Sequence, residues 1–365
     1  MKKQIIYFCL AIISCQITMA NQPKPVSFQQ GTLDIVTTLY GGFLIDRDGF
    51  MWIGTVGHGA YRYDSYEKKS FIVPKEGTMV SSIVEDHDGT IWLASFSNGI
   101  ASYDKSTGKF TSYTNDPTNV NSLGSNNISF SPQKLFVDVS NRLWVGTDDA
   151  GISVFDKTSQ TWKHMKHNPD NENSLSDNAV MAITQGRDGA IWIGTQNGGL
   201  NHYNQETMTW SHFSHDPQDD TSLNDMWVTS LLEDKSGVLW VGTKNGGLNR
   251  YRKEDASFHS YTYDQSNPRS IGSNYVWSIF EDISGYIWTT HLASPSVGLD
   301  RLNKENGQFD RFGHDPNNPG SVSSNAVTQI GQDPQTSTLW IVNYNGKIDR
   351  QETNTTKFRH WTADN

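Results

Sequence analysis

Short runs of alternating apolar and polar residues recur along this chain, and each run is followed by a turn that contains aspartate and glycine. Residues 228–243 are typical: Val-Thr-Ser-Leu-Leu-Glu, then Asp-Lys-Ser-Gly, then Val-Leu-Trp-Val-Gly-Thr. Alternation with a period of two favours a strand, and the run around the tryptophan is rich in residues that favour strands. Glycine in the turn tolerates the positive φ angles that other residues avoid. The pattern therefore predicts β-hairpins.

The same phrase returns seven times, and a tryptophan marks each copy. These tryptophans are Trp52, Trp92, Trp144, Trp192, Trp240, Trp288 and Trp340. Their separations are 40, 52, 48, 48, 48 and 52 residues. Self-similarity at a period of this size indicates a repeat architecture. Residues shared by all copies are expected to be structural, so the seven tryptophans are predicted to lie in the core.

Each copy predicts four antiparallel strands. The alternating run and the tryptophan run are two of them, an Asn-Gly-Gly turn leads into a third, and a segment with two aromatic residues three apart supplies the fourth. One such sheet cannot bury both of its faces, whereas seven sheets packed radially around a channel can. We therefore predict an all-β fold, a seven-bladed β-propeller of four-stranded antiparallel blades, over residues 34–365.

Two segments compete for the outer edge of the last blade. Residues 357–361 (Lys-Phe-Arg-His-Trp) continue the seventh copy, and residues 26–28 (Val-Ser-Phe) also have the composition of a strand. The latter lie in an N-terminal segment, residues 21–33, that precedes the first blade. The sequence leaves open which of the two closes the ring.

The first twenty residues have the pattern of an export signal. A basic start at Lys2 and Lys3 precedes an apolar stretch, residues 5–13, and small residues at 18–20 offer a cleavage site. A second interpretation is a lipoprotein signal cut before Cys15, which would anchor the protein through a lipid. Either interpretation predicts a periplasmic protein. Cys9 and Cys15 are the chain's two cysteines, so no disulfide is predicted within the propeller.

Charge and hydropathy exclude some classes of partner. The formal net charge is −10, and no basic stripe is present to offset the repulsion of phosphates, so nucleic acid is not an expected ligand. The apolar stretch near the N-terminus is shorter than the ~20 residues that span a bilayer. No second apolar stretch follows it, so no transmembrane segment is predicted in the mature chain.

The combined phrases resemble the two-component regulator propeller repeat. The tryptophan phrase is followed in four copies by a linker of the type His-Asp-Pro…Ser-Leu-Ser, at residues 115–126, 167–178, 215–226 and 314–325. Such repeats form the periplasmic sensor region of hybrid two-component systems, typical of gut Bacteroidetes. The resemblance implies recognition of an oligosaccharide and a signal passed to a membrane sensor kinase.

The chain departs from the full layout of that family. It contains no second propeller, β-sandwich, kinase or DNA-binding region. We therefore expect either a stand-alone propeller or the N-terminal part of a truncated sensor. A second propeller, a sensor kinase and a second copy of the chain are the partner proteins considered.

Three aromatic residues break the repeat in two adjacent blades. Five residues after the linker serine the copies carry Asn127, Ala179, Trp227, Tyr275 and Ala326, and seven residues after it they carry Ser129, Met181, Thr229, Trp277 and Thr328. Trp227, Tyr275 and Trp277 precede inner strands, where the connections open onto one face around the channel. Flat aromatic faces there suit the apolar side of a sugar ring. The alternative is that they fill a wide channel mouth.

The turn after each tryptophan strand is expected to open on the same face. It carries polar residues suited either to sugar hydroxyls or simply to the turn itself. They are His58, Asn98, Asp149, Asn197 and Asn245. His58 and His291 break the pattern and complete the set of candidate ligand-binding residues.

No zinc spacing, nucleophile elbow or phosphate loop is present. We therefore predict a non-catalytic binding protein without cofactor, metal or catalytic residues. One alternative is a propeller lyase, in which His58 or His291 is the base beside a metal, although the sequence shows no repeat-breaking carboxylate next to either. Another alternative is a scaffold that binds proteins through the flat face of the ring.

Overall fold

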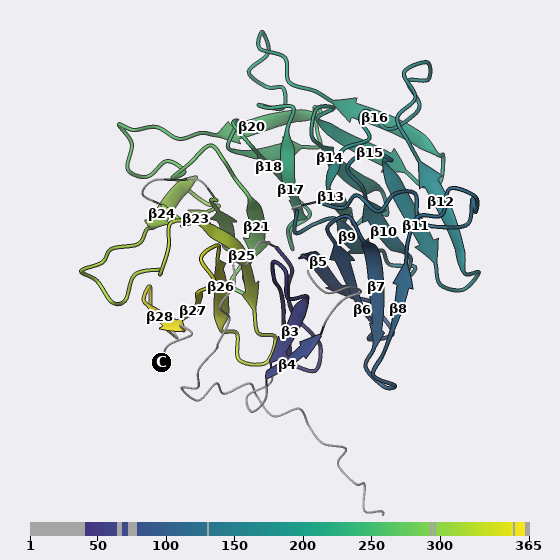
Figure 1. Cartoon of the computed structure of the whole chain (residues 1–365). Coiled ribbons are helices and arrows are strands. Elements are labelled where there is room, and N and C mark those ends of the chain that lie inside the picture. Colours follow the sequence, from purple (N-terminus) through teal and green to yellow (C-terminus); the bar gives the residue numbers. More distant parts are fainter. Residues whose placement is uncertain are drawn as a thin grey trace, which may run out of the picture.

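The protein is a seven-bladed β-propeller in which each blade is a four-stranded antiparallel sheet (Figure 1). The computed structural model describes residues 41–63, 68–71, 79–129, 131–292, 294, 297–352 and 355–361. Within them, every sheet consists of four strands that follow one another in the sequence. The predicted fold class, blade number and strand number are confirmed. The predicted export signal and the segment 21–33 lie outside the described residues.

The strands of the first three blades are β1 (Phe43–Ile45), β2 (Met51–Gly54), β3 (Ala60–Tyr63) and β4 (Lys68–Phe71); β5 (Val80–Glu85), β6 (Ile91–Ser95), β7 (Gly99–Asp104) and β8 (Lys109–Tyr113); and β9 (Leu135–Val137), β10 (Leu143–Gly146), β11 (Ile152–Asp156) and β12 (Thr161–Met165). Blades four and five are β13 (Val180–Gln185), β14 (Ile191–Thr195), β15 (Leu200–Asn204) and β16 (Thr209–Phe213), and β17 (Val228–Glu233), β18 (Leu239–Thr243), β19 (Leu248–Arg252) and β20 (Ser257–Tyr261). Blades six and seven are β21 (Ser278–Glu281), β22 (Ile287–Thr290), β23 (Leu299–Asn303) and β24 (Gln308–Phe312), and β25 (Val327–Gln332), β26 (Leu339–Asn343), β27 (Ile348–Gln351) and β28 (Phe358–Trp361).

The Asp-x-x-Gly turn explains why aspartate and tryptophan recur six residues apart. In the first blade, the Asp46 carboxylate accepts the backbone N–H groups of Asp48 and Phe50 at 3.0 and 2.9 Å and the indole N–H of Trp52 at 2.9 Å. Gly49 closes the turn with a φ of 84°. One buried carboxylate thus fixes the hairpin and satisfies the buried indole, which would otherwise cost about 1–3 kcal/mol.

The core is divided among the interfaces between neighbouring blades. Trp240 of blade five, for example, packs in one cluster with Ile287 and Phe309 of blade six. Trp340 of blade seven packs in the same way with Ile53 of blade one. The first strand of each blade lines the channel, and β1 lies against β25, so this packing closes the ring.

The C-terminal segment occupies the outer edge of blade seven. β28 pairs with β27, with Phe358 opposite Gln351 and His360 opposite Asp349, at the edge of the blade (Figure 1). Of the two competing segments, residues 357–361 therefore supply the fourth strand of this blade. Residues 26–28 lie outside the described residues. Each blade is consequently built from one continuous stretch of chain.

An ion pair attaches this last strand. His360 Nδ1 lies 2.9 Å from Oδ1 of the fully buried Asp349. The hydrogen bond to Asp349 raises the pKa of His360 above the usual 6.5, and it outweighs the opposing effect of partial burial. Since the pKa is higher in the folded state, the pair stabilises the fold fully below pH 6.5. Its contribution is lost as the pH rises through the raised pKa.

We therefore expect His360→Gln to destabilise the protein at pH 6 and to have little effect at alkaline pH. The measurement is the difference in free energy of unfolding between wild type and variant, from urea titrations at several pH values. Taking the difference removes the contributions of other histidines, such as His202, whose pKa burial lowers. A difference that does not change with pH would contradict the prediction.

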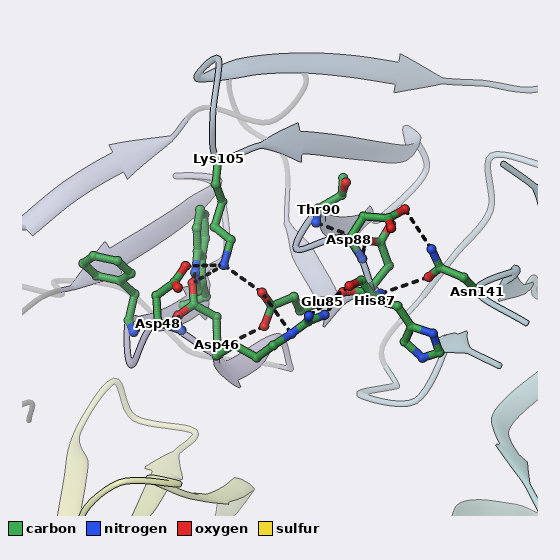
Figure 2. A network of polar contacts seen from close by, with 12 residues as sticks. Asp46, Asp48, Glu85, His87, Asp88, Thr90, Lys105 and Asn141 are labelled. Atoms are coloured by element: carbon green, nitrogen blue, oxygen red, sulfur yellow. Dashed lines mark hydrogen bonds and ion pairs between the residues drawn. The ribbon is translucent and has the colours of Figure 1, made fainter. Parts of the chain in front are cut away.

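Lysine bridges join neighbouring blades at the face that carries the Asp-x-x-Gly turns. Lys105, after β7, reaches back to blade one, with its Nζ 2.6 Å from Asp48 and 3.5 Å from Asp46 (Figure 2). It also binds Glu85 of its own blade at 2.7 Å. Lys157 of blade three binds Asp86 of blade two, and Lys304 of blade six binds Asp234 of blade five, in the same way, whereas Asp138 is paired within its own blade by Arg142.

Candidate functional site

The connections between blades and the turns between second and third strands lie at one end of the sheets. The N–H of Gly199 donates to the carbonyl of Met226, and that of Gly247 donates to the carbonyl of Asn274, both at 3.0 Å. Each turn is thereby tied to the connection that leads into the next blade. We call the face formed by these turns and connections the channel-mouth face. It holds the predicted ligand-binding residues other than Trp277 and His291, which are buried.

Trp227 is half-buried on this face, at the start of β17. Its carbonyl accepts the backbone N–H of Lys244 at 3.0 Å, and the ammonium of Lys244 lies 3.5 Å from the centre of an indole ring. A cation over an aromatic face is attracted by its quadrupole. Lys244 therefore holds the indole in place and adds a hydrogen-bond donor beside it.

Tyr275 holds the equivalent place at the start of β21 in the neighbouring blade. It is half-buried, and burial raises the pKa of its phenol to about 12. Trp277 packs edge-on against it, with ring centroids 6.0 Å apart, but is only 5% exposed, and its indole N–H has no partner among the described residues. Trp277 therefore supports Tyr275 and leaves Trp227 and Tyr275 as the accessible rings.

The polar residues of the turns are already engaged with aspartates that the sequence did not single out. Asn197 donates its backbone and side-chain N–H groups to Asp177, at 2.8 and 3.3 Å, and Asn245 binds Asp225 in the same way. In blade three the roles are reversed, because Asp149 accepts from Asn127 at 2.5 Å. The signal for these pairs is the distance of 20 residues between partners in adjacent segments of one unit.

Asn98 and His58 lie on the corresponding turns of blades two and one. The side chain of Asn98 donates to the carbonyl of Phe96 at 3.0 Å, within its own turn. His58 is exposed. Neither residue is joined to Trp227 or Tyr275 by a contact in the described part of the chain.

His291 is fully buried, and the expectation that no carboxylate lies beside it is wrong. Its Nε2 lies 2.8 Å from Oδ2 of Asp300, which is also fully buried, and its Nδ1 lies 2.9 Å from the carbonyl of Tyr275. Asp300 in addition accepts the N–H of Gly272 at 2.6 Å. The pair thus anchors a connection inside blade six and is not accessible to a ligand.

Comparison with other blades explains this pair. The place of His291 is taken by Thr195 in blade four, and the place of Asp300 by Asn201, whose carbonyl oxygen accepts the N–H of Ser176 at 2.9 Å. Both positions change together in blade six. That joint departure from the repeat is the signal that would have found the pair in the sequence.

Blade three carries an insertion that the sequence reasoning missed. Val145 pairs with Leu135 as Ile193 pairs with Ile183, so Gln133 is the structural counterpart of Met181. Counting from the linker serine gave Ser129 instead. The separation of 52 residues between Trp92 and Trp144 is four more than the usual 48, and these four extra residues indicate the insertion.

The inserted segment forms a polar network at the inner side of blade three. The fully buried Lys134 donates to Asp148 at 2.6 Å and to the carbonyl of Val180, and Ser129 donates to the same aspartate at 2.8 Å. Burial lowers the pKa of Lys134, and Asp148 opposes the change. Gln133 binds the backbone of Leu231 in blade five through both its amide atoms, at 2.7 and 2.8 Å. These contacts brace the inner strands against one another.

Within the described residues, no three histidine, cysteine, aspartate or glutamate side chains are grouped so as to hold a metal ion. The same part of the chain has no helix with the length and hydrophobicity required to cross a bilayer.

Comparison with protein families identifies the class of repeat. The model of the two-component regulator propeller matches residues 75–97, 174–197 and 222–245. Each matched segment ends at or near the turn after a repeat tryptophan. The chain therefore carries two-component regulator propeller repeats, and the recognition made from the sequence is confirmed. No curated protein matches the chain.

Solved structures share the propeller. The extracellular domain of a hybrid two-component system from B. thetaiotaomicron superposes with a TM-score of 0.70 at 22% identity, covering 86% of this chain and 40% of that one. A second such domain from the same organism gives 0.50 at 18% identity, covering 88% of this chain and 48% of that one. The chain thus spans less than half of these domains.

A virginiamycin B lyase from Staphylococcus aureus, solved as an inactive variant with quinupristin, superposes with a TM-score of 0.64 at 16% identity. The match covers 88% of this chain and 97% of the lyase. At such identities each of these likenesses establishes the fold, and the function has to be argued from the site.

Proposed function

We propose that this protein is an exported, non-catalytic sensor propeller that binds an oligosaccharide on its channel-mouth face and acts in two-component signalling. The observation that carries the proposal is the pair of accessible rings, Trp227 and Tyr275, on adjacent blades of a propeller whose repeats are those of two-component regulators. The similarity to extracellular domains of sensor systems supports an extracytoplasmic location. The partner that would receive the signal of ligand binding is a membrane sensor kinase or a second propeller.

The geometry suits a sugar. An indole presents a large flat surface to the C–H groups of a pyranose, and polar groups around it select the hydroxyls. Lys244 lies over Trp227, and the Asp177 and Asp225 carboxylates stand on the connections that precede β13 and β17. Because these acceptors are held by asparagine N–H groups, they are oriented before a ligand arrives, which lowers the entropic cost of binding.

Trp227→Ala is expected to weaken oligosaccharide binding at least about tenfold, since a central aromatic contact contributes about 2 kcal/mol. A glycan-array screen of the mature chain identifies the ligand, and calorimetric titration then compares wild type and variant. Tyr263→Ala is a matched control, because Tyr263 is also an exposed aromatic ring with a cation, Arg311, 5.4 Å from its centre. Equal affinities for wild type and Trp227→Ala would remove the proposed site.

Burial of His291 argues against one of the two candidate bases of the lyase alternative. His291 is fully buried and hydrogen-bonded through both ring nitrogens. His58 is exposed but lies across blade seven from it. Release of products from the ligand that the screen identifies, prevented by a chelator, would contradict the non-catalytic assignment.

A further inference from the structure

A groove between blades six and seven, at the face opposite the channel mouth, lacks, in the described part of the chain, the lysine bridge to the turn aspartate that joins blades one and two, two and three, and five and six. It is a cavity of about 650 Å³ whose lining includes Asp282, Tyr286, Arg301, Gln332 and Thr338. It lies among the Asp-x-x-Gly turns, where lysine bridges join other blades.

Three other grooves are sealed by an ammonium group from the next blade. Lys105 lies between Asp46 and Glu85 (Figure 2). Lys304 lies 3.1 Å from both Asp234 and Glu281. The turn carboxylates covered in this way are almost inaccessible: Asp46 is 0% and Asp234 is 1% exposed. A buried carboxylate is stable in these grooves because a cation from the next blade compensates its charge.

Asp282 is the counterpart of these carboxylates in blade six. Lys235 donates to its backbone carbonyl at 2.9 Å, but no cation of the described residues forms an ion pair with its carboxylate. Its oxygens accept the N–H of Tyr286 at 3.0 Å and the indole N–H of Trp288 at 2.8 Å. The described residues supply no ion pair to it, although it is only 6% exposed. Asp282 is therefore a buried carboxylate that accepts the hydrogen bonds of its hairpin but has no cation paired with it among the described residues.

The sequence shows where the cation was lost. Lys304 follows Leu302 by two residues, and Leu302 pairs with Phe309. In blade seven Gln351 pairs with Phe358 in the same register, and the residue two positions on, at 353, is a threonine. Its placement lies outside the described residues, but its side chain carries no amine.

Two other positions of the groove carry uncharged residues where several other blades carry charged ones. Gln332 takes the place of Glu85, Glu233 and Glu281. Its Oε1 accepts the N–H of Ile283 at 2.7 Å, just as each of those carboxylates accepts a backbone N–H from the turn of the preceding blade. Ile283 itself replaces a basic residue and is 62% exposed. Tyr286 is 36% exposed. The positions of Gln332 and Ile283, close to Asp282, are thus uncharged.

The remaining charges of the lining are balanced elsewhere. Arg301 binds Asp310 at 2.7 Å and holds its guanidinium 4.7 Å from the centre of the Tyr286 ring. Glu352 binds Arg359 at 2.8 Å, and Lys357 is exposed to solvent, where its charge is screened. An arginine over the turn aromatic does not prevent a second cation from binding.

Blade one shows this directly. Arg62 lies 4.4 Å from the centre of the Phe50 ring while Lys105 binds Asp46 in the same groove. The two cations are therefore compatible within one groove of this protein.

We propose that the groove between blades six and seven binds a small ligand that carries a primary ammonium on a neutral hydroxylated body, as an amino sugar does. The ammonium takes the place of the missing lysine at Asp282, where a charged hydrogen bond forms in a largely desolvated setting. Gln332, the neighbouring threonines and the ring of Tyr286 contact the body. This site is separate from the channel-mouth face and does not depend on the function proposed for it.

The test uses the full chain with glucosamine, N-acetylglucosamine and glucose at neutral pH, and binding is measured by saturation-transfer NMR and calorimetry. Glucosamine alone is expected to bind, with the two uncharged sugars at least about tenfold weaker, because a charged hydrogen bond is lost. Equal binding of glucose and glucosamine, or no binding of glucosamine, would overturn the proposal.

Variants separate the site from effects on folding. Asp282→Asn is expected to weaken glucosamine binding at least about tenfold, whereas Asp234→Asn, which disturbs the same kind of turn but a groove already filled by Lys304, is expected to leave it unchanged. Thr353→Lys restores the lysine of the repeat and should abolish binding while raising the melting temperature. Glucosamine binding that survives both Asp282→Asn and Thr353→Lys would place the ligand elsewhere, and loss of it in Trp227→Ala would assign it to the channel-mouth face.

Discussion

Replacement of Trp240 by alanine is expected to lower the free energy of unfolding by about 3–5 kcal/mol. The indole is 2% exposed and packs with Leu248, Ile279 and Phe309 across the interface between blades five and six. Its N–H donates to Asp234 at 3.0 Å. Alanine would leave a cavity between two sheets and remove one of the bonds that organise the turn.

The pKa of Asp234 is expected to change when the indole of Trp240 is removed. Burial raises the pKa of this carboxyl, but hydrogen bonds from Ser236, Trp240 and Val238, together with Lys304, outweigh burial and hold the pKa at about 2. Losing the indole donor should therefore raise this pKa. Carboxyl resonances followed by NMR during acid titration measure the change.

A urea titration of Trp240→Ala measures the loss of stability, and Trp210→Ala is the matched control. Trp210 lies on the fourth strand of its blade, is half-buried, and contacts Tyr203 with ring centroids 4.6 Å apart. Its removal is expected to cost clearly less, because no sealed cavity results. Equal losses for the two variants would contradict the assignment of the repeat tryptophans to the interfaces between blades.

Replacement of His291 by threonine is expected to destabilise the protein by about 3 kcal/mol. The substitution leaves Asp300 fully buried and, among the residues that the structure describes, with the N–H of Gly272 as its remaining hydrogen-bond donor. The double variant His291→Thr with Asp300→Asn restores the combination of Thr195 and Asn201 in blade four. It is expected to recover most of the loss, since the buried charge is removed along with its partner.

Thermal and urea unfolding of the two single variants and the double variant form a double-mutant cycle. A positive coupling between the two positions supports the interpretation of the pair as a structural anchor. Additive losses would contradict it, because they would mean that the two side chains do not depend on each other.

The fold was predictable from sequence because every blade is encoded locally. The alternating run, the Asp-x-x-Gly turn and the tryptophan strand each specify a hairpin, and seven copies leave few ways to bury their faces. The outer strand of blade seven was not predictable, since residues 26–28 and 357–361 have equally good strand composition. The pairing of Phe358 with Gln351 resolves it.

The site was predictable only in part. The breaks in the repeat located Trp227 and Tyr275 on the channel-mouth face, but the burial of Trp277 depends on packing beneath the connection and has no sequence signature. The pair of His291 and Asp300 joins two strands, and the loss of a cation at Asp282 involves two blades. Such contacts appear only when equivalent positions are compared across repeats in their structural register.

Because each four-stranded blade is one stretch of polypeptide, no sheet within residues 41–361, as far as they are described, combines strands from the two ends of the chain. A gene rearrangement that duplicates or deletes a whole unit in frame would leave every remaining sheet complete. The join between blades one and seven depends on side chains such as Trp340 and Ile53 and on the amide of Gln329, which donates to the carbonyl of Gly41 at 2.8 Å. That join is where this circular molecule is expected to exchange its amide protons first and to tolerate new termini or an added module.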